Sequence, residues 1–526
     1  MNTRVQRRSY EYAPVAVDVK ADRIARELKI FLEKAPSQRI GHSPRKRLPI
    51  SLDDVLAPAL TFAITELQRI APGAAENILA QSAWEDLRRD LSARLALALT
   101  PTLRLQQNTA KAVARSMETV AQDKRPSRTL GPAITLLETV NEFPGLLETA
   151  ARLISAWIDA QRELLARLLR DRAEVCSIFL RGRQRFRATH LRARLSDPHD
   201  GARTATMIEF GERRRVVYEP RPADREELWF EALRWLSRNG THASFRVPKM
   251  LARKRYVWME FLRPKSCKSL NDVRILYFRW GIQAALAQIL GATDLHRENW
   301  LAVGSQPILV DAELIGDAAP PSVRSGKKSL DRQSLPALLK TGLLPFSSRD
   351  RVGFYRGIAP LDATILETAL PSCWPRYQRA IQRPSRYVND LVRGFKMVTK
   401  VLATPGLARK FFRKIILPNK NLRNQRVLLR ATAQYVRLLR ESFEARNMIC
   451  ASGRWQHLAR ECCLSAPDRR VGLAEASALL RCDIPKFTIR RSAIPPSWKR
   501  FSAAVAELKS SSQLLRGRVL LGRHRG

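Results

Sequence analysis

The sequence has little that would carry the chain into or across a membrane. Among its 526 residues, the longest apolar candidate is the short run 282–290, which contains two glutamines. A spanning helix needs about 20 predominantly apolar residues. The N-terminal MNTRVQRRSYEYAP is positively charged, but no apolar core follows it, so we expect neither a secretory signal nor a membrane span.

Cysteine pairs suited to metal or redox chemistry are also lacking. None of the seven cysteines forms a C-x-x-C pair, and their number is odd. In a chain of this length, that pattern predicts reduced, mostly buried thiols in a cytoplasmic protein. Cys450, His457, Cys462 and Cys463 can be read as a zinc cluster, but their spacing matches no standard site. We therefore favour ordinary core and surface thiols.

Acidic residues are scarce relative to basic ones. The chain has 49 Asp and Glu against 93 Lys and Arg, a formal net charge of +44. A charge of this size points to anionic partners such as nucleic acid, a membrane surface or an acidic peptide. The basic residues are spread along the whole chain, with no aromatic-interleaved recognition motif and no zinc-finger spacing. A basic nucleic-acid-binding protein is therefore an alternative that we do not favour.

The spacing of apolar residues changes twice along the chain. Its length predicts two to four packed units. Apolar residues recur at helical spacing from about residue 18 to 170 and again toward the C-terminus, whereas short β-type runs begin near residue 185. The sequence predicts an α+β fold with three parts: an N-terminal helical region (1–184), a central core (185–395) and a C-terminal helical region with a basic tail (396–526).

The central part has a recognisable order of elements. The pattern predicts a hairpin, a helix, a strand, a long helix beginning at Asn271, a polar loop and a second hairpin. The hairpins and the strand are expected at 206–210 with 215–219, at 256–262, and at 300–303 with 307–310. The segment Asp224-Arg-Glu-Glu227 predicts a capping box at the start of the first helix. A kinase has this general plan, so we expect a kinase-like core.

The densest polar cluster lies between the long helix and the second hairpin. It reads TDLHREN (293–299), and an acid follows the hairpin at Asp311. Phosphoryl transfer needs a carboxylate near the accepting hydroxyl and oxygen ligands for magnesium. Asp294 is therefore the candidate base, and Asn299 and Asp311 are candidate metal ligands, with His296 and Glu313 supporting them or binding metal. For an isolated D-x-H-x-x-N, loop caps and surface salt bridges would be the better explanation, because short motifs often occur by chance.

Six segments together resemble the dehydratase half of class II lanthipeptide synthetases, in that family's order and over roughly residues 185–395. They are SDPHDGAR (196–203), VVYEPR (216–221), RYVWMEFL (255–262), LYFRWG (276–281), DLHRENWLAVGSQPILVDAEL (294–314) and LLKTGLLP (338–345). The resemblance implies a lipid-kinase-like core that uses ATP and Mg²⁺ to phosphorylate Ser and Thr of a ribosomal precursor peptide with a leader. It also implies that the phosphate is then eliminated to give dehydroamino acids.

The resemblance also implies roles for particular residues. Asp294, His296, Asn299, Asp311 and Glu313 would serve phosphorylation and metal binding. Asp197 and His199 match the family's upstream acid and histidine. The family's elimination segment, R-x-x-x-R-x-T, is matched by RAIQRPS with Ser for Thr, which makes Arg379, Arg383 and Ser385 candidates. An ordinary basic helix end is the competing interpretation of that segment.

The chain departs from the family at two points. Glu219 stands where the family has a phosphate-contacting Lys. Glu219 and Arg221 face the same side of a strand, so either they pair or Arg221 takes over the phosphate contact. A catalytically degenerate, kinase-like protein that binds peptide or regulates a partner is thus the alternative function. The chain also ends soon after the elimination segment and has no Cys-His dipeptide, so we do not expect it to close rings. Either a separate cyclase does so, or the product stays dehydrated and uncyclised. A basic surface would suit an acidic leader.

Overall fold

The computed structural model describes residues 18–34, 52–120, 135–182, 186–293, 295–313, 315, 336–344, 372–418, 424–427, 429–466, 468–490 and 498–520. The chain forms two compact units, each made from two stretches of sequence. Unit 1 comprises residues 1–220 and 430–485, and unit 2 comprises residues 221–429 and 486–526. The hydrophobic pattern of the sequence predicted domain boundaries after residues 184 and 395. The two units divide the chain at other positions. The division into three parts stays a prediction.

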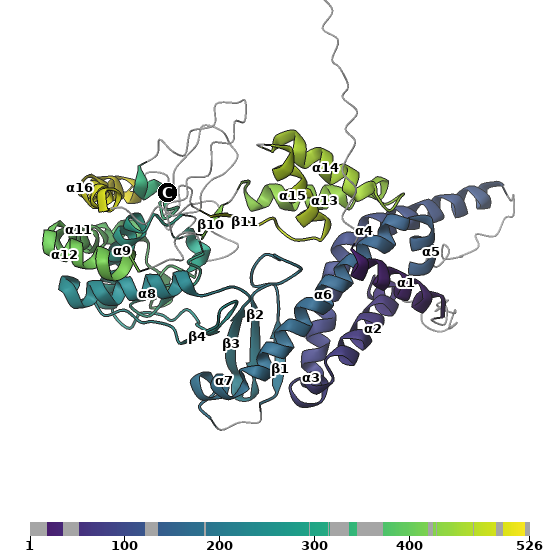
Figure 1. The fold of residues 1–526 in the computed structure, drawn as a ribbon, viewed down its shortest axis with the longest axis horizontal. Coiled ribbons are helices and arrows are strands. Elements are labelled where there is room, and N and C mark those ends of the chain that lie inside the picture. The colour runs from purple at the N-terminus through teal and green to yellow at the C-terminus, as the bar shows by residue number, and fades with distance from the viewer. Residues whose placement is uncertain are drawn as a thin grey trace, which may run out of the picture. The chain divides into compact units, whose positions relative to one another are not determined.

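Unit 1 contains a group of N-terminal helices, as predicted for its described residues (Figure 1). They are α1 Val19–Lys34, α2 Leu52–Ile70, α3 Pro72–Asn77, α4 Gln81–Val120, α5 Leu136–Glu142, α6 Pro144–Arg170 and α7 Arg172–Phe179. Helix α6 is central, since it packs against α1, α2, α4 and α5. The indole of the buried Trp157 donates to the Asp90 carboxylate at 3.0 Å, which ties α6 to α4. No helix in the described parts of the chain has the length and apolar character to cross a membrane.

Unit 1 also contains three antiparallel strands, β1 Ala188–Arg192, β2 Thr206–Phe210 and β3 Arg214–Glu219. The predicted β2–β3 hairpin is confirmed, with Thr206 opposite Tyr218 and Phe210 opposite Arg214. Its turn is the single helical turn Gly211–Arg213.

The stretch 430–485 returns to the N-terminal helices. It forms α13 Thr432–Ser442, α14 Gly453–Ser465 and α15 Arg469–Leu480. Arg454 is 2% exposed, and its guanidinium donates to Thr149 Oγ1 of α6 at 3.2 Å. The Gly145 amide donates to the Met448 carbonyl at 3.0 Å, and a Cβ at Gly145 would lie 2.6 Å from the Cys450 carbonyl oxygen. A small residue at the start of α6 thus permits the close approach of the two stretches.

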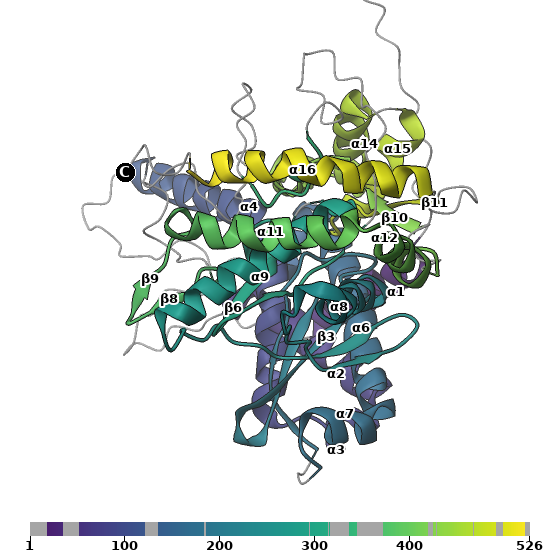
Figure 2. The same ribbon diagram turned by 90° about the vertical axis from the view of Figure 1, so that its left-hand side faces the viewer.

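Unit 2 follows the predicted order of elements. It contains α8 Asp224–Leu236, β4 Met250–Ala252, β5 Val257–Glu260, α9 Leu270–Ile289, β6 Trp300–Val303, β7 Gln306–Leu309, α10 Ala337–Lys340, β8 Arg376–Tyr377, β9 Ala380–Ile381, α11 Val388–Ala403, α12 Pro405–Phe411, β10 Asn424–Val427, β11 Phe487–Arg490 and α16 Trp498–Leu520. β4 pairs with β5, β6 with β7, β8 with β9 and β10 with β11, all antiparallel. Figure 2 shows α11 lying against both α9 and α16.

The predicted capping box at the start of the first helix of this region is wrong. The N-cap of α8 is Ala223, which makes no side-chain cap, and Asp224 is already helical. The Glu227 amide, which a box on Asp224 would bind through the Asp224 side chain, donates instead to the Ala223 carbonyl at 2.9 Å. The long helix α9 is capped instead: Ser269 accepts from the Asp272 amide, and the Asp272 side chain accepts from the Ser269 amide, which is a full capping box.

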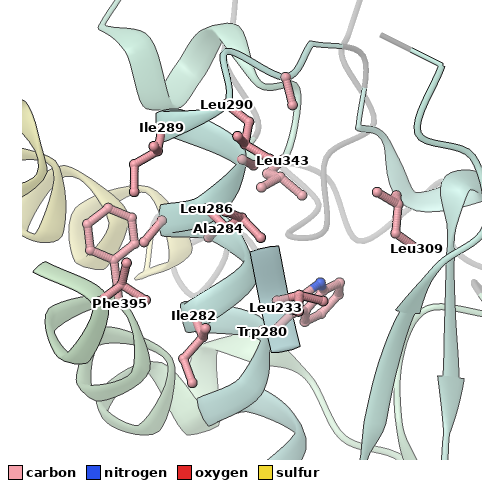
Figure 3. Packing of buried hydrophobic residues seen from close by; sticks show 14 of the residues in the cluster. Leu233, Trp280, Ile282, Ala284, Leu286, Ile289, Leu290, Leu309, Leu343 and Phe395 are labelled. Carbon is pink, nitrogen blue, oxygen red and sulfur yellow. The ribbon is translucent and has the colours of Figure 1, made fainter. Parts of the chain in front are cut away.

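Helix α9 forms the centre of the core of unit 2. Nearly every residue from Trp280 to Leu290 is buried, and Figure 3 shows Leu233, Leu309, Leu343 and Phe395 around it. Helix α11 approaches very closely. A Cβ at Gly281 would overlap the Leu391 carbonyl oxygen, and one at Gly394 would overlap the Phe278 carbonyl oxygen. The two glycines face each other's helix backbones, which lets the helices pack without intervening side chains.

The cysteines are free thiols, and four of the seven are buried. Burial raises the pKa of Cys373 and of Cys462 to about 12. Such thiols stay protonated and inert at neutral pH. Cys450 is exposed. The prediction of mostly buried thiols is thus confirmed.

Candidate functional site

The hairpin β6–β7 brings Asn299 and Asp311 to one place. The Val310 amide donates to the Asn299 carbonyl at 2.8 Å, so these residues close the open end of the hairpin. Asn299 is the last residue of a single helical turn, Arg297–Asn299. At the turn of the hairpin, Arg279 of α9 donates to the carbonyl and the hydroxyl of Ser305, both at 2.8 Å. The backbone of Asn299 is therefore adjacent to Val310, the residue before Asp311, at the end of a hairpin that α9 holds in position.

The loop before the hairpin carries the other two candidates. Asp294 lies outside the described residues. The Leu295 amide donates to the Thr341 carbonyl at 2.8 Å, so residues 338–344 anchor the loop. His296 is half-buried, and its Nδ1 has no hydrogen-bond partner among the described residues. A buried, unsatisfied ring nitrogen costs free energy, which is a reason to expect a ligand or water there.

Asp311 is paired with Arg221. One Asp311 oxygen accepts from Arg221 Nη2 at 3.1 Å and from the Glu313 amide at 3.0 Å, and the Asp311 side chain is 44% exposed. Arg221 Nη1 lies 2.8 Å from Glu226 Oε1 of α8. The same Glu226 oxygen accepts from the Ala312 amide at 3.2 Å. Arg221 thus joins a buried carboxylate to a half-exposed one.

Glu313 is held by two cations. Its carboxylate contacts Arg426 of β10 and lies 2.6 Å from Lys486 Nζ, just before β11. Its side chain is 16% exposed. This carboxylate therefore fastens the β10–β11 pair to the residues after β7. Of the three predicted metal ligands, Asn299 and Asp311 lie at the two ends of the β6–β7 hairpin, which meet at the bond between Val310 and Asn299. Glu313 is paired instead with Arg426 and Lys486.

The upstream acid and histidine belong to unit 1. His199 Nδ1 donates to the Ile484 carbonyl at 2.7 Å, and the Ile484 amide donates to the Pro198 carbonyl at 2.8 Å. The Asp197 side chain is exposed. Because a carbonyl accepts from Nδ1, the neutral imidazole of His199 carries its proton there.

The loop around His199 wraps a buried carboxylate that sequence reasoning missed. Asp483 accepts from the Gly201 and Ala202 amides, both at 2.7 Å. Burial raises the pKa of Asp483, while the two amides oppose that shift. Asp200, Gly201 and Ala202 have φ values of 50°, 92° and 60°, a run of left-handed residues that turns successive amides toward one acceptor. Only the glycine in SDPHDGAR hinted at this conformation.

The candidate elimination residues lie on the β8–β9 hairpin and just after it. Arg379 is exposed in the hairpin turn with φ 64°, so the competing helix-end interpretation is wrong for it. Arg383 is exposed and precedes the single helical turn Pro384–Tyr387, which contains Ser385 and leads into α11. The phenol of Tyr277 donates to the Gln382 carbonyl at 2.5 Å, which fixes the segment to α9.

The structure does not place this segment beside Asn299 and Asp311. The Cys267 amide donates to the Arg376 carbonyl at 2.7 Å, and the Cys267 thiol donates to the Gly304 carbonyl at 3.3 Å. The β8–β9 hairpin is therefore anchored near the turn of β6–β7, at the end opposite Asn299 and Asp311. Strands of four residues are about 13 Å long. The elimination role of Arg379, Arg383 and Ser385 stays a prediction.

Comparison with known proteins adds two findings. The model of the family described as "Domain of unknown function (DUF4135)" matches residues 143–490. The chain is also similar to a "Lacticin 481/lactococcin biosynthesis protein LcnDR2" of Lactococcus lactis subsp. lactis. The two are 21% identical over 225 residues, which cover 36% of this chain and 24% of that protein. The match thus spans about a quarter of the length of the curated relative.

Proposed function

This chain belongs to the DUF4135 family, and on that premise we propose that it is a lanthipeptide dehydratase with a kinase-like core. It would phosphorylate Ser and Thr of a ribosomal precursor peptide with ATP and Mg²⁺ and then eliminate the phosphate. The relative named for lacticin 481/lactococcin biosynthesis supports a role in modifying such a peptide. The geometry around Arg221 supports the phosphoryl-transfer step.

The single observation that carries the proposal is the bridge from Glu226 through Arg221 to Asp311. In protein kinases, a cation paired with a helix carboxylate and an aspartate that holds Mg²⁺ must both be in place for transfer. Arg221 provides such a cation, and Glu226 of α8 provides the helix carboxylate. Arg221 can therefore supply the positive charge that is missing at Glu219.

The donor set fits a magnesium-bound nucleotide. Asn299 and Asp311 offer amide and carboxylate oxygens, which are the ligands that Mg²⁺ prefers. Bound ATP would supply the transferable phosphoryl group, and its metal would neutralise charge on the phosphates. Arg221 would hold a phosphate oxygen, Asp294 would take the proton of the accepting hydroxyl, and His296 Nδ1 would gain a partner that it lacks among the described residues.

The elimination step has less support from geometry. It removes the α-proton of the phosphorylated residue and expels phosphate, so it needs a base and cations. Arg379 and Arg383 are exposed cations, and they would hold the departing phosphate.

A second function is favoured by one observation. Glu313 and Asp311 are both paired with cations of the chain itself, which leaves fewer carboxylate oxygens for a metal. A catalytically degenerate protein that binds peptide would show this arrangement and would not bind Mg²⁺-nucleotide.

Calorimetry with ATP and Mg²⁺ separates the two functions. The wild-type protein is expected to bind, and Asp311→Asn is expected to weaken binding by about tenfold or more, because a charged metal ligand is lost. Glu298→Gln is the matched control, since Glu298 is exposed in the same turn as Asn299; its affinity should stay within about twofold of wild type. Absence of binding in the wild type would leave the degenerate peptide-binding protein as the function.

A further inference from the structure

The chain turns tightly after β7, where it carries the candidate metal ligand Asp311. The Glu313 amide donates to the Asp311 carboxylate at 3.0 Å, so this side chain accepts from the backbone two residues further on, as in an Asx turn. Helix α8 holds the residue between them, because the Ala312 amide donates to Glu226 at 3.2 Å. The direction of the Asp311 carboxylate therefore depends on where the backbone of residue 313 lies.

The side chain of Glu313 engages two cations at once. Its Oε1 lies 2.6 Å from Lys486 Nζ, and its Oε2 accepts from the Arg426 guanidinium. The exposed fractions of the side chains are 16% for Glu313, 13% for Arg426 and 22% for Lys486. Charges that are largely shielded from water attract each other more strongly than exposed ones, so this cluster fixes the position of residue 313.

The pairing of β10 with β11 explains why both cations reach one carboxylate. Arg426 of β10 is opposite Thr488 of β11 in the antiparallel register, and Lys486 is the residue immediately before β11. Side chains two residues apart lie on the same face of a strand, and diagonal neighbours across a strand pair are within reach of long side chains. Both cations therefore lie on one face of the pair, where Glu313 contacts them.

Magnesium would have to compete with both cations for Glu313. As a metal ligand, Glu313 would give up Arg426 and Lys486 and leave two positive charges near a dication. Asp311 meets no such obstacle. The bonds from Arg221 and from the Glu313 amide both use its Oδ1, and its side chain is 44% exposed. The two carboxylates of this turn therefore suit different tasks.

We infer that Glu313 is a positioning residue and not a metal ligand. Its pairing with Arg426 and Lys486 holds the turn, and the turn directs the Asp311 carboxylate toward the magnesium-bound nucleotide. The cations act through the side chain of Glu313, and Glu313 acts through its backbone amide on Asp311. The β10–β11 pair thereby belongs to the machinery of phosphoryl transfer. This role rests on the proposed function, because it takes Asp311 as the ligand.

An exchange of charges between positions 313 and 486 tests this role. Glu313→Lys places three cations together, whereas Glu313→Lys combined with Lys486→Glu keeps the net charge of the wild type. The combined variant again has one carboxylate between two cations, so the turn should be held as before. A lysine side chain has no acceptor atom for Mg²⁺. The exchange therefore rescues a positioning residue but does not rescue a metal ligand.

The first readout is calorimetry of the full chain with ATP and Mg²⁺. Glu313→Lys should weaken binding by about tenfold or more, because repulsion between the shielded cations opens the turn. The combined variant should bind within about threefold of wild type. The control is Glu507→Lys in α16, where Glu507 is exposed. It changes the net charge as Glu313→Lys does, and its affinity should stay within about twofold of wild type.

The second readout, hydrogen exchange of the backbone amides, needs no nucleotide. Exchange reports how often a backbone hydrogen bond opens, and the Glu313 amide is bonded to the Asp311 carboxylate. Exchange at residues 311–313 should be about tenfold faster in Glu313→Lys than in the wild type, because the anchored turn then opens locally. In the combined variant it should return to the wild-type rate.

Two results would overturn the inference and leave the proposed function standing. They are a combined variant that binds nucleotide as poorly as Glu313→Lys, and unchanged exchange at residues 311–313 in Glu313→Lys. A wild type that does not bind ATP and Mg²⁺ would overturn the proposed function, and the positioning role with it. If an exchanged variant unfolds, Glu313→Gln decides instead. Its side-chain carbonyl still accepts from the same cations, so affinity near that of the wild type is expected; a loss as large as that of Asp311→Asn would make Glu313 a metal ligand.

Discussion

Arg221→Met should abolish Mg²⁺-dependent nucleotide binding and lower the stability of unit 2. The substitution removes the cation between Glu226, which is 1% exposed, and Asp311. Removing one partner of a buried ion pair costs about 3–5 kcal/mol, because the other charge is left buried and unpaired. Urea unfolding should show this loss, and calorimetry with ATP and Mg²⁺ should show the loss of binding.

A second variant separates folding from function. Arg221→Met combined with Glu226→Gln removes the buried charge together with its partner, so it should recover much of the lost stability. It should still fail to bind nucleotide, since the phosphate-holding cation is absent. Arg221→Lys keeps the charge but cannot reach both carboxylates with a planar fork, so intermediate binding is expected. Wild-type nucleotide affinity in the double variant would show that Arg221 does not contact phosphate.

Gly281→Ala should be among the most damaging single substitutions in unit 2. Its Cβ would overlap the Leu391 carbonyl oxygen, which belongs to the backbone of α11 and cannot move aside as a flexible side chain would. The helices α9 and α11 would have to separate, at a cost of about 3 kcal/mol or more. The measurement is the urea midpoint of the purified variant.

The matched control is Gly517→Ala in α16. A Cβ at Gly517 would meet nothing within 4 Å, so alanine should stabilise this helix by up to about 1 kcal/mol through its better helix propensity. If Gly281→Ala lowers the free energy of unfolding and Gly517→Ala raises it, the contact between helices, and not helix propensity, explains why residue 281 must be glycine. A mild effect at Gly281, similar in size to that at Gly517, would contradict the close packing of α9 and α11.

The hairpins could be predicted because the residues that specify a hairpin, two apolar runs and the turn between them, are neighbours in the sequence. The β2–β3 and β6–β7 hairpins have short runs rich in apolar residues on each side of a turn, and the turn of the second contains Gly304 at φ 61°. The two ends of the second hairpin lie together, since the Val310 amide donates to the Asn299 carbonyl; the roles of Asn299 and Asp311 stay predictions. The capping box at Asp224 failed because the helix begins one residue earlier, with Ala223 as its N-cap, and local sequence does not fix a helix boundary to a single position.

The contacts that position the candidate residues in each unit join residues far apart in the chain. Arg221 and Asp311 are 90 positions apart, Lys486 and Glu313 are 173 apart, and Asp483 and Gly201 are 282 apart. No periodicity or turn signal relates such pairs, since tertiary packing alone brings them into contact. The return of residues 430–485 to unit 1 was missed for the same reason. Arg221 was expected to pair with Glu219 or to contact phosphate, and its partners Glu226 and Asp311 could not be identified from the sequence.

Mass spectrometry of a precursor peptide tests the central claim most directly. The full chain is incubated with ATP, Mg²⁺ and a Ser- and Thr-containing precursor peptide encoded next to it. The account predicts the loss of one water for each modified residue, dependent on ATP and absent with Asp311→Asn. An unchanged peptide mass, with a wild-type protein that is folded and binds the peptide, would contradict the dehydratase function.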